Sequence, residues 1–209
     1  MRNIFLDCEF TGIRHDTELI SIGLIAPAYH EGSSDKTFYA ELSDYSDKKV
    51  TPWLRKNVVS KLVLGKWNVD KDYHPYSNAV TCAGTRVHVE QALSHWIDLL
   101  ITESNCGKVK MWSDCLAYDW VLFRDLMTQG DTLSFPSEQI LYIPFDICTL
   151  FEDRGINPDI DREKFAFGEV YSEMLQKKHN ALWDARVILS CYNKLMKIDK
   201  GTTIPQWMK

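Results

Sequence analysis

Apolar runs of strand length dominate the beginning of the chain. Residues 2–10, 19–26 and 37–42 are rich in Ile, Leu, Phe and Tyr, and each run has the length of a β-strand. The segment 27–36 contains Pro, Gly and two adjacent Ser residues, which favour a loop. Three strands in succession with short connections predict an antiparallel meander.

The rest of the chain mixes helical spacing with shorter apolar runs. Apolar residues three and four positions apart predict amphipathic helices at 52–64, 87–101 and 181–196. The remaining short elements are a strand at 109–112, a helix through Leu122 and Leu126, a strand at 140–145 and a helix at 148–152. This order predicts an α/β fold in which helices flank a mixed central sheet, with its first three strands antiparallel.

The whole chain of 209 residues has the size of a single domain with a full core. Between two predicted helices, residues 65–86 are polar and irregular, and we expect them to form an insertion or surface loop. The tail from residue 199 is expected to be extended. No internal repeat or low-complexity tract interrupts this pattern.

Charge and cysteine content narrow the class of protein. The net charge of −5 argues against a protein that coats duplex DNA with a basic face. It leaves nucleic acid open as a partner, because bound divalent cations reverse the sign of an acidic pocket. No apolar stretch has the length of a membrane span, and no signal peptide is recognised. Six scattered cysteines without a C-x-x-C pair favour free thiols and the cytoplasm.

The first candidate site is the stretch LDCEF, which places Asp7 and Glu9 inside an apolar strand. Side chains alternate along a strand, so both acids share a face with Phe5, roughly 6.6 Å apart along the backbone. Carboxylates this close repel each other unless a positive group lies between them. A divalent cation such as Mg²⁺ suits this position. An acid pair on a solvent-facing edge is the simpler alternative for this motif alone.

A second candidate is the stretch HNALWDA at residues 179–185. Asn180 is a suitable N-cap, so His179 lies just before the helix and Asp184 lies in its first turn. Such a pair can face one pocket, the histidine as proton acceptor and the carboxylate as metal ligand. A capping Asn beside a solvated His and an acid that complements the helix dipole is an equal alternative.

The third candidate lies in SDCLAYDWVLF, residues 113–123, at the junction of a strand and a helix. Asp114 and Asp119 compete here with Asp125. Asp114 fits a loop or cap, and Asp125 beside Arg124 fits a surface position. Asp119 falls between two aromatic residues in an apolar helix, where a charged group needs a partner.

Together, D-x-E, an aromatic residue followed by Asp, and H-x4-D resemble the DEDDh branch of the DnaQ-like 3′-5′ exonucleases, which includes RNase T and oligoribonuclease. DCEFTG, ELISIGLIA with FYAEL, and HNALWDA look like the mycobacterial-type exoribonuclease family. The motifs run in the expected order over nearly the whole chain. The resemblance implies a ribonuclease H-like fold.

The same resemblance implies the roles of the site residues. Asp7, Glu9, Asp119 and Asp184 would bind two Mg²⁺ or Mn²⁺ ions, and His179 would be the general base. The expected activity is release of nucleoside 5′-monophosphates from the 3′ end of single-stranded RNA or of a 3′ overhang. RNA is favoured over DNA as partner, no membrane is involved, and a homodimer is an assembly to test.

Residues beside the motifs are candidates for substrate binding. In the family, the turn after D-x-E, here Phe10, Thr11 and Gly12, holds the terminal nucleotide, although Phe10 also suits the core. Tyr118 and Trp183 adjoin the other motifs and could stack a base, a contact worth about 1–3 kcal/mol. Packing is the usual role of such aromatic residues, so we expect at most one platform.

Other activities remain open at this stage. The same mechanism could act on single-stranded DNA. A phosphatase of the haloacid dehalogenase type uses a strand-end D-x-D-x-T with an aspartyl nucleophile, and DCEFT is close to it, but Glu9 replaces the second Asp. A catalytically inactive nucleic-acid-binding module on the same fold is the third alternative, which the complete set of acids disfavours.

Overall fold

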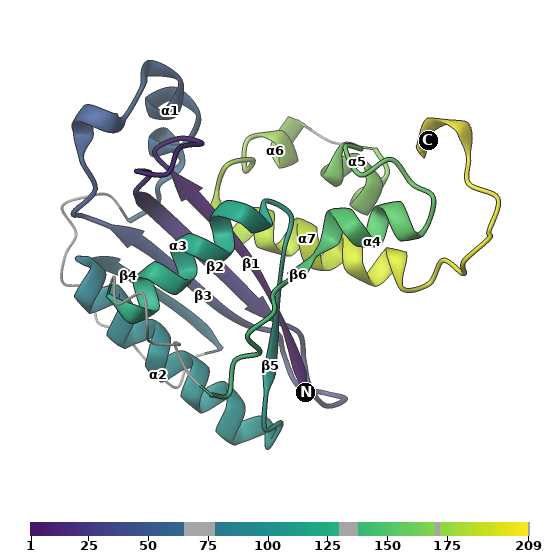
Figure 1. The fold of residues 1–209 in the computed structure, drawn as a ribbon, viewed down its shortest axis with the longest axis horizontal. Helices are drawn as coiled ribbons and strands as arrows, with labels where there is room; N and C mark the ends of the chain where they lie inside the picture. The colour runs from purple at the N-terminus through teal and green to yellow at the C-terminus, as the bar shows by residue number, and fades with distance from the viewer. Residues whose placement is uncertain (65–77, 130–137, 170–171, 209) are drawn as a thin grey trace.

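The computed structural model describes residues 1–64, 78–129, 138–169 and 172–208 (Figure 1). Within these residues, six strands form one sheet in the order β4-β3-β2-β1-β5-β6. β1 and β3 are antiparallel to β2, whereas β4, β5 and β6 each run parallel to a neighbour, which confirms the predicted mixed sheet. The strands are β1 (Arg2–Phe10), β2 (Leu19–Ala26), β3 (Lys36–Leu42), β4 (Ala79–Gly84), β5 (Val109–Ser113) and β6 (Phe145–Asp146).

Helices cover both faces of the sheet, so the core has two layers. On one face, α2 (Arg86–Ser104) and α3 (Leu116–Thr128) pack against the larger apolar cluster. On the other face lies α7 (Ala181–Leu195), together with α4 (Ile147–Asp153) and α5 (Arg162–Phe167) (Figure 1). The shorter elements are η1 (Asp47–Lys49), α1 (Pro52–Asn57), η2 (Val59–Lys61), α6 (Ser172–Leu175) and η3 (Gln206–Met208).

β1 lies inside the sheet between β2 and β5, and this explains its apolar sequence. Leu6 and Cys8 belong to the cluster beneath α2 and α3, whereas Phe5 belongs to the cluster around α7. The alternation expected for a strand therefore holds. Asp7 and Glu9 share the α7 face with Phe5, as the sequence predicts.

Gly23 allows α7 to approach the sheet closely beside Asp7. Gly23 is paired with Asp7 across β1 and β2. A Cβ atom at Gly23 would lie 2.3 Å from the backbone carbon of Ala181 and from the backbone nitrogen of Leu182. Only a residue without a side chain fits this contact. The first turn of α7 is thereby placed next to Asp7.

The predicted loop at 65–86 is wrong for its last part. Ala79–Gly84 forms β4, the strand at one edge of the sheet, and α2 begins at Arg86. β4 consists of small residues, and its exposed positions alternate with buried ones only at its start. Such a segment has little apolar signal for a strand. The rest of the predicted insertion, residues 65–77, lies outside the described residues.

Other boundaries also differ from the sequence prediction. The helix expected at 52–64 ends at Asn57, and the short 3-10 helix η2 follows it. The strand expected at 140–145 is reduced to one bridge from Ile140 to Val109 and the two residues of β6. The sequence analysis did not predict α5 or α6, and η3 is a short helical turn within the tail predicted to be extended. Across the described parts of the chain, no helix could cross a membrane.

Candidate active site

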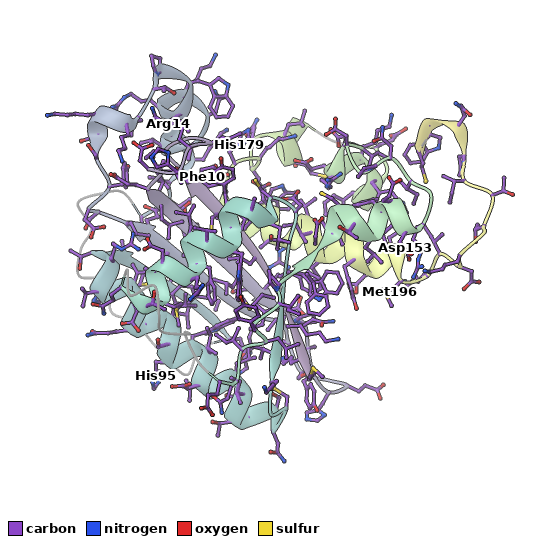
Figure 2. All side chains as sticks on the ribbon, in the orientation of Figure 1. Phe10, Arg14, His95, Asp153, His179 and Met196 are labelled. Atoms are coloured by element: carbon purple, nitrogen blue, oxygen red, sulfur yellow. The ribbon has the colours of Figure 1, made fainter. Side chains whose placement is uncertain are left out.

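The end of β1 carries two acids into a largely closed environment. Asp7 and Glu9 are each 9% exposed. They line a cavity of about 480 Å³, to which Asp114, His179 and Asp184 also contribute. Figure 2 shows Phe10 and His179 near each other at this end of β1. Residues far apart in the sequence therefore meet at one edge of the molecule.

Asp119 reaches the same place from the first turn of α3. Its side chain is completely buried. The backbone N–H of Cys8 donates a hydrogen bond to Asp119 Oδ1 at 3.3 Å, which connects α3 directly to β1. Asp119 Oδ2 and Asp7 Oδ2 are both buried, and neither has a hydrogen-bond partner among the residues that the structure describes. Two buried carboxylate oxygens without partners are costly unless a cation or proton satisfies them.

The start of α7 supplies a histidine and a further acid. Asn180 is the N-cap, and its side-chain oxygen accepts a hydrogen bond from the Trp183 N–H at 3.2 Å. The His179 N–H donates to Asp184 Oδ2 at 2.9 Å. His179 has a φ of 66°, in the left-handed region that non-glycine residues rarely adopt. Its hydrogen bond to Asp184 helps to hold this backbone conformation.

Two side chains flank the imidazole ring of His179. Its Nδ1 lies 3.7 Å from Glu9 Oε1. The ring of Trp53, from α1, lies at a centroid distance of 5.3 Å and an interplanar angle of 76°. Trp53 is itself 56% exposed. In the sequence, Trp53 is one apolar position of the helix predicted at 52–64, and nothing connects it to HNALWDA.

Burial and mutual repulsion raise the pKa values of the clustered acids. Burial, with the neighbouring carboxylate of Glu9, raises the pKa of Asp184 to about 8. Burial, followed by the charges of Asp184 and Asp119, raises the pKa of Asp7 well above its usual range. Burial also raises the pKa of Asp119 strongly, with Asp114 adding to the effect. A bound cation would lower these pKa values again, because it favours the ionised carboxylates.

The donor set fits hard divalent cations. Asp7, Asp114 and Asp119 each offer an oxygen within 4.8 Å of the others, and Glu9, His179 and Asp184 form a second group by the same measure. Carboxylate oxygens dominate both groups, and Mg²⁺ and Mn²⁺ prefer such ligands. The two buried oxygens without partners lie in the first group. The chain therefore has an acidic cluster able to hold divalent metal.

The structure adds residues from α5 that the sequence analysis missed. Asp114, which competed with Asp119 as the third acid, lies near Asp7 as well, but it has a countercharge because Arg162 Nε is 3.5 Å from its Oδ2. Glu163 is buried and lies 3.6 Å from Lys178 Nζ. Without a prediction of α5, no sequence signal connects Arg162 or Glu163 to the site.

Four of the residues expected to bind substrate lie at or beside the turn after β1, and the fifth, Trp183, lines a different cavity. Phe10 and Tyr118 stack on each other with centroids 5.2 Å apart and pack on the core beside β1. Thr11 Oγ1 accepts a hydrogen bond from the Glu18 N–H, and Gly12 has a φ of 144°, so both shape the turn after β1. Trp183 is not in this group, because it packs near Phe167 and lines a different cavity.

Three solved structures with a similar fold are those of exonucleases. The nuclease domain of 3'hExo, a DEDDh family member bound to rAMP, aligns with a TM-score of 0.65 at 14% identity, covering 98% of this chain and 96% of that one. A 3′-exonuclease with 3′-end specific recognition of a histone mRNA stem-loop gives 0.63 at 14% identity, over 95% and 83%. A full-length 3′-exonuclease gives 0.58 at 14% identity, over 99% and 88%. The fold is thus the ribonuclease H-like fold of the DEDDh exonucleases.

A family model identifies the chain more closely. Residues 2–196 match the 3′-5′ exoribonuclease Rv2179c-like domain, and the chain belongs to this family. It is therefore a hydrolase of the exoribonuclease class, as the motifs predicted. No curated protein sequence matches the chain.

Proposed function

We propose that the protein is a metal-dependent exonuclease that removes nucleotides one at a time from the 3′ end of single-stranded RNA or of 3′ overhangs. The products would be nucleoside 5′-monophosphates. The observation that carries this proposal is the pair of buried, unpartnered oxygens of Asp7 and Asp119. They lie at the strand end where Glu9, His179 and Asp184 also meet. Family membership supplies the reaction class.

Asp7, Glu9, Asp119 and Asp184 would hold two Mg²⁺ or Mn²⁺ ions. Bound there, the ions would stabilise the charge that develops on the attacking and leaving oxygens of an in-line displacement at phosphorus. Asp7 is suited to the centre of such a site, because the charges of both Asp184 and Asp119 act on its carboxylate.

His179 would accept the proton of the attacking water. Its N–H bond to Asp184 and its ring contacts with Glu9 and Trp53 fix its orientation before substrate arrives. Imidazole is the side chain that most often accepts a proton in such a role. A neutral imidazole can hold one ring nitrogen toward Glu9 and keep the other for the water.

The 3′-terminal nucleotide would lie at the turn after β1. Thr11 and Gly12 form this turn, and the stacked pair of Phe10 and Tyr118 lies at its base. The exposed ring of Trp53 offers another apolar contact at the rim. The proposal favours RNA over DNA, and it is supported by the family and by solved relatives that bind rAMP or recognise the 3′ end of an mRNA stem-loop.

A time course on end-labelled RNA and DNA of matched sequence, with and without Mn²⁺, tests this function. We expect metal-dependent release of mononucleotides from the 3′ end and faster loss of RNA. Asp7→Asn should abolish the activity, whereas Asp98→Asn, an exposed acid on α2, should leave it intact. Cleavage of a circular strand would contradict the exonuclease. If DNA is degraded as fast as RNA or faster, DNA is the substrate of the same mechanism. A phosphorylated Asp7 would indicate a phosphatase.

A further inference from the structure

A second cavity lies behind the turn that carries His179. It has a volume of about 340 Å³. Gln176, Lys177 and Asn180 line it, whereas Lys178 and His179 line the acidic cavity, so the turn before α7 separates the two. The other lining residues are Lys61, Val63, Leu182, Trp183 and Arg186.

The charge of this cavity is opposite to that of the acidic one. Lys61, Lys177 and Arg186 are cations, and none of the described residues that line the cavity is acidic. Lys61 Nζ donates to the Gln176 carbonyl oxygen at 2.8 Å, which holds the ammonium group beside the turn. An ammonium group has three donors, so others remain for a ligand. A cluster of three cations in a protein of net charge −5 indicates an anionic ligand.

Neutral donors and an apolar surface complete the cavity. Trp183 Nε1 is buried and has no hydrogen-bond partner in the described structure. The side-chain oxygen of Asn180 already accepts a hydrogen bond from the backbone N–H of Trp183, so the side-chain NH₂ group of Asn180 has its own N–H donors to offer. Val63 and Leu182 provide apolar surface. The ligand should therefore combine acceptor oxygens with an apolar ring, within the size range of small-ligand sites.

The indole of Trp183 is unsuited to stacking a base. Lys177 Nζ lies over the ring at 4.9 Å from its centroid, and Phe167 packs near it at 5.8 Å. The apolar part of a ligand would then contact Val63 and Leu182, while its phosphate would lie among Lys61, Lys177 and Arg186.

We propose that this cavity binds a nucleotide, with its phosphate on the three cations and its base on Val63 and Leu182. The choice of ligand rests on the proposed function, which makes nucleotides both substrate units and products. The nucleotide can be a free nucleoside 5′-monophosphate or a unit of an RNA strand whose 3′ end lies in the acidic cavity. Trp183, which the sequence connected with substrate, belongs to this second site.

Equilibrium dialysis of AMP in EDTA tests the site apart from catalysis. Without metal, the acidic cavity repels a phosphate, so binding reports on the cationic cavity. We expect Arg186→Glu to weaken AMP binding at least about tenfold, the usual effect of losing a charge-assisted hydrogen bond. Lys197→Glu, an exposed cation after α7, is the matched control and should have little effect. Absence of AMP and RNA binding in the wild type, or equal losses in both variants, would overturn the proposal.

A comparison of substrates distinguishes the two sources of nucleotide. If the cavity holds a unit of the strand, Arg186→Glu should raise KM for a 12-nucleotide RNA and leave a dinucleotide unaffected. If it holds a free mononucleotide, AMP binding should fall while KM for both RNAs stays the same. An inactive enzyme that still binds AMP through Arg186 would refute the proposed function and leave this site standing. An active enzyme that does not bind AMP through Arg186 would refute this site and leave the proposed function standing.

Discussion

His179 combines an unusual backbone conformation with a proposed role as general base. Its left-handed φ directs the ring between Glu9 and Trp53, while its N–H is bound to Asp184. Its ring therefore does not need to be a metal ligand in order to be well ordered. Ligation and proton transfer can be separated by experiment.

His179→Ala should reduce the rate by roughly 10²–10⁴-fold, the usual contribution of a positioned general base. The rise in melting temperature on addition of Mn²⁺ should persist, because the four acids remain. Thermal unfolding with and without metal, together with initial rates, checks both parts. Loss of the metal-induced stabilisation would make His179 a ligand or a structural residue instead. Turnover near that of the wild type would place the base elsewhere.

Trp53→Ala tests whether the indole orients His179. We expect a fall in kcat of about two- to tenfold, because an edge contact between aromatic rings is worth about 0.5–1.5 kcal/mol. Trp207, in η3, is 51% exposed against 56% for Trp53, which makes Trp207→Ala a matched control. Steady-state kinetics on one RNA should show the loss only in the first variant. An unchanged kcat would mean that Trp53 does not position the base.

The two acids near Asp7 should differ in importance. Asp119 Oδ2 lacks a partner, whereas Asp114 is near Arg162. Asp119→Asn should therefore abolish activity, and Asp114→Asn should cost about 10–100-fold, as outer partners of a metal site do. The hydrolysis rates of the two variants, measured over a Mn²⁺ titration, compare the importance of the two acids. The opposite order would show that Asp114 is the third ligand.

At the scale of elements, the contact of α7 with β2 depends on the missing side chain of Gly23. Gly23→Ala would force the first turn of α7 away from Asp7, because the new Cβ overlaps the backbone of Ala181. We expect a loss of about 1–3 kcal/mol in the free energy of unfolding and a larger loss of activity. Gly32→Ala, where nothing lies within 4 Å of the added Cβ, should keep full activity despite its positive φ. Denaturant unfolding and RNA hydrolysis are the measurements.

The sequence predicted elements well where apolar residues are periodic and poorly where other forces decide. The three antiparallel strands and α7 have strong patterns, and they occur close to the predicted positions. β4 consists of small residues at a sheet edge, and α5 is too short for periodicity. Arg162 and Trp53 approach the site only through tertiary packing, so local sequence could not identify them. The sequence draws attention to Asp7 and Asp119 because a charged side chain inside an apolar segment needs a partner.

At the scale of the whole molecule, the acidic cavity couples stability to pH. The folded protein without metal raises the pKa of Asp184 from 3.8 to about 8, so the native state binds this proton more tightly than the unfolded chain. This contribution to stability is complete below pH 4 and is lost as pH rises through about 8.

The melting temperature in EDTA should therefore fall between pH 6 and pH 8.5 by more in the wild type than in Asp184→Asn. Addition of Mg²⁺ should stabilise the protein more at pH 8.5 than at pH 6, because metal must displace protons. Differential scanning calorimetry at matched ionic strength measures both. A steeper fall in Asp184→Asn would contradict this account.

The distribution of the site along the chain bears on the biosynthesis of the protein. Asp7 and Glu9 lie in the first strand, whereas His179 and Asp184 lie at the start of the last long helix. Ribosomes add roughly 5–20 residues per second, so on the order of ten seconds or more separate the synthesis of the two groups. Until α7 emerges and docks against Gly23, the growing chain lacks two of its five proposed catalytic groups. The proposed activity can therefore arise only after α7 has been synthesised and has docked against the sheet.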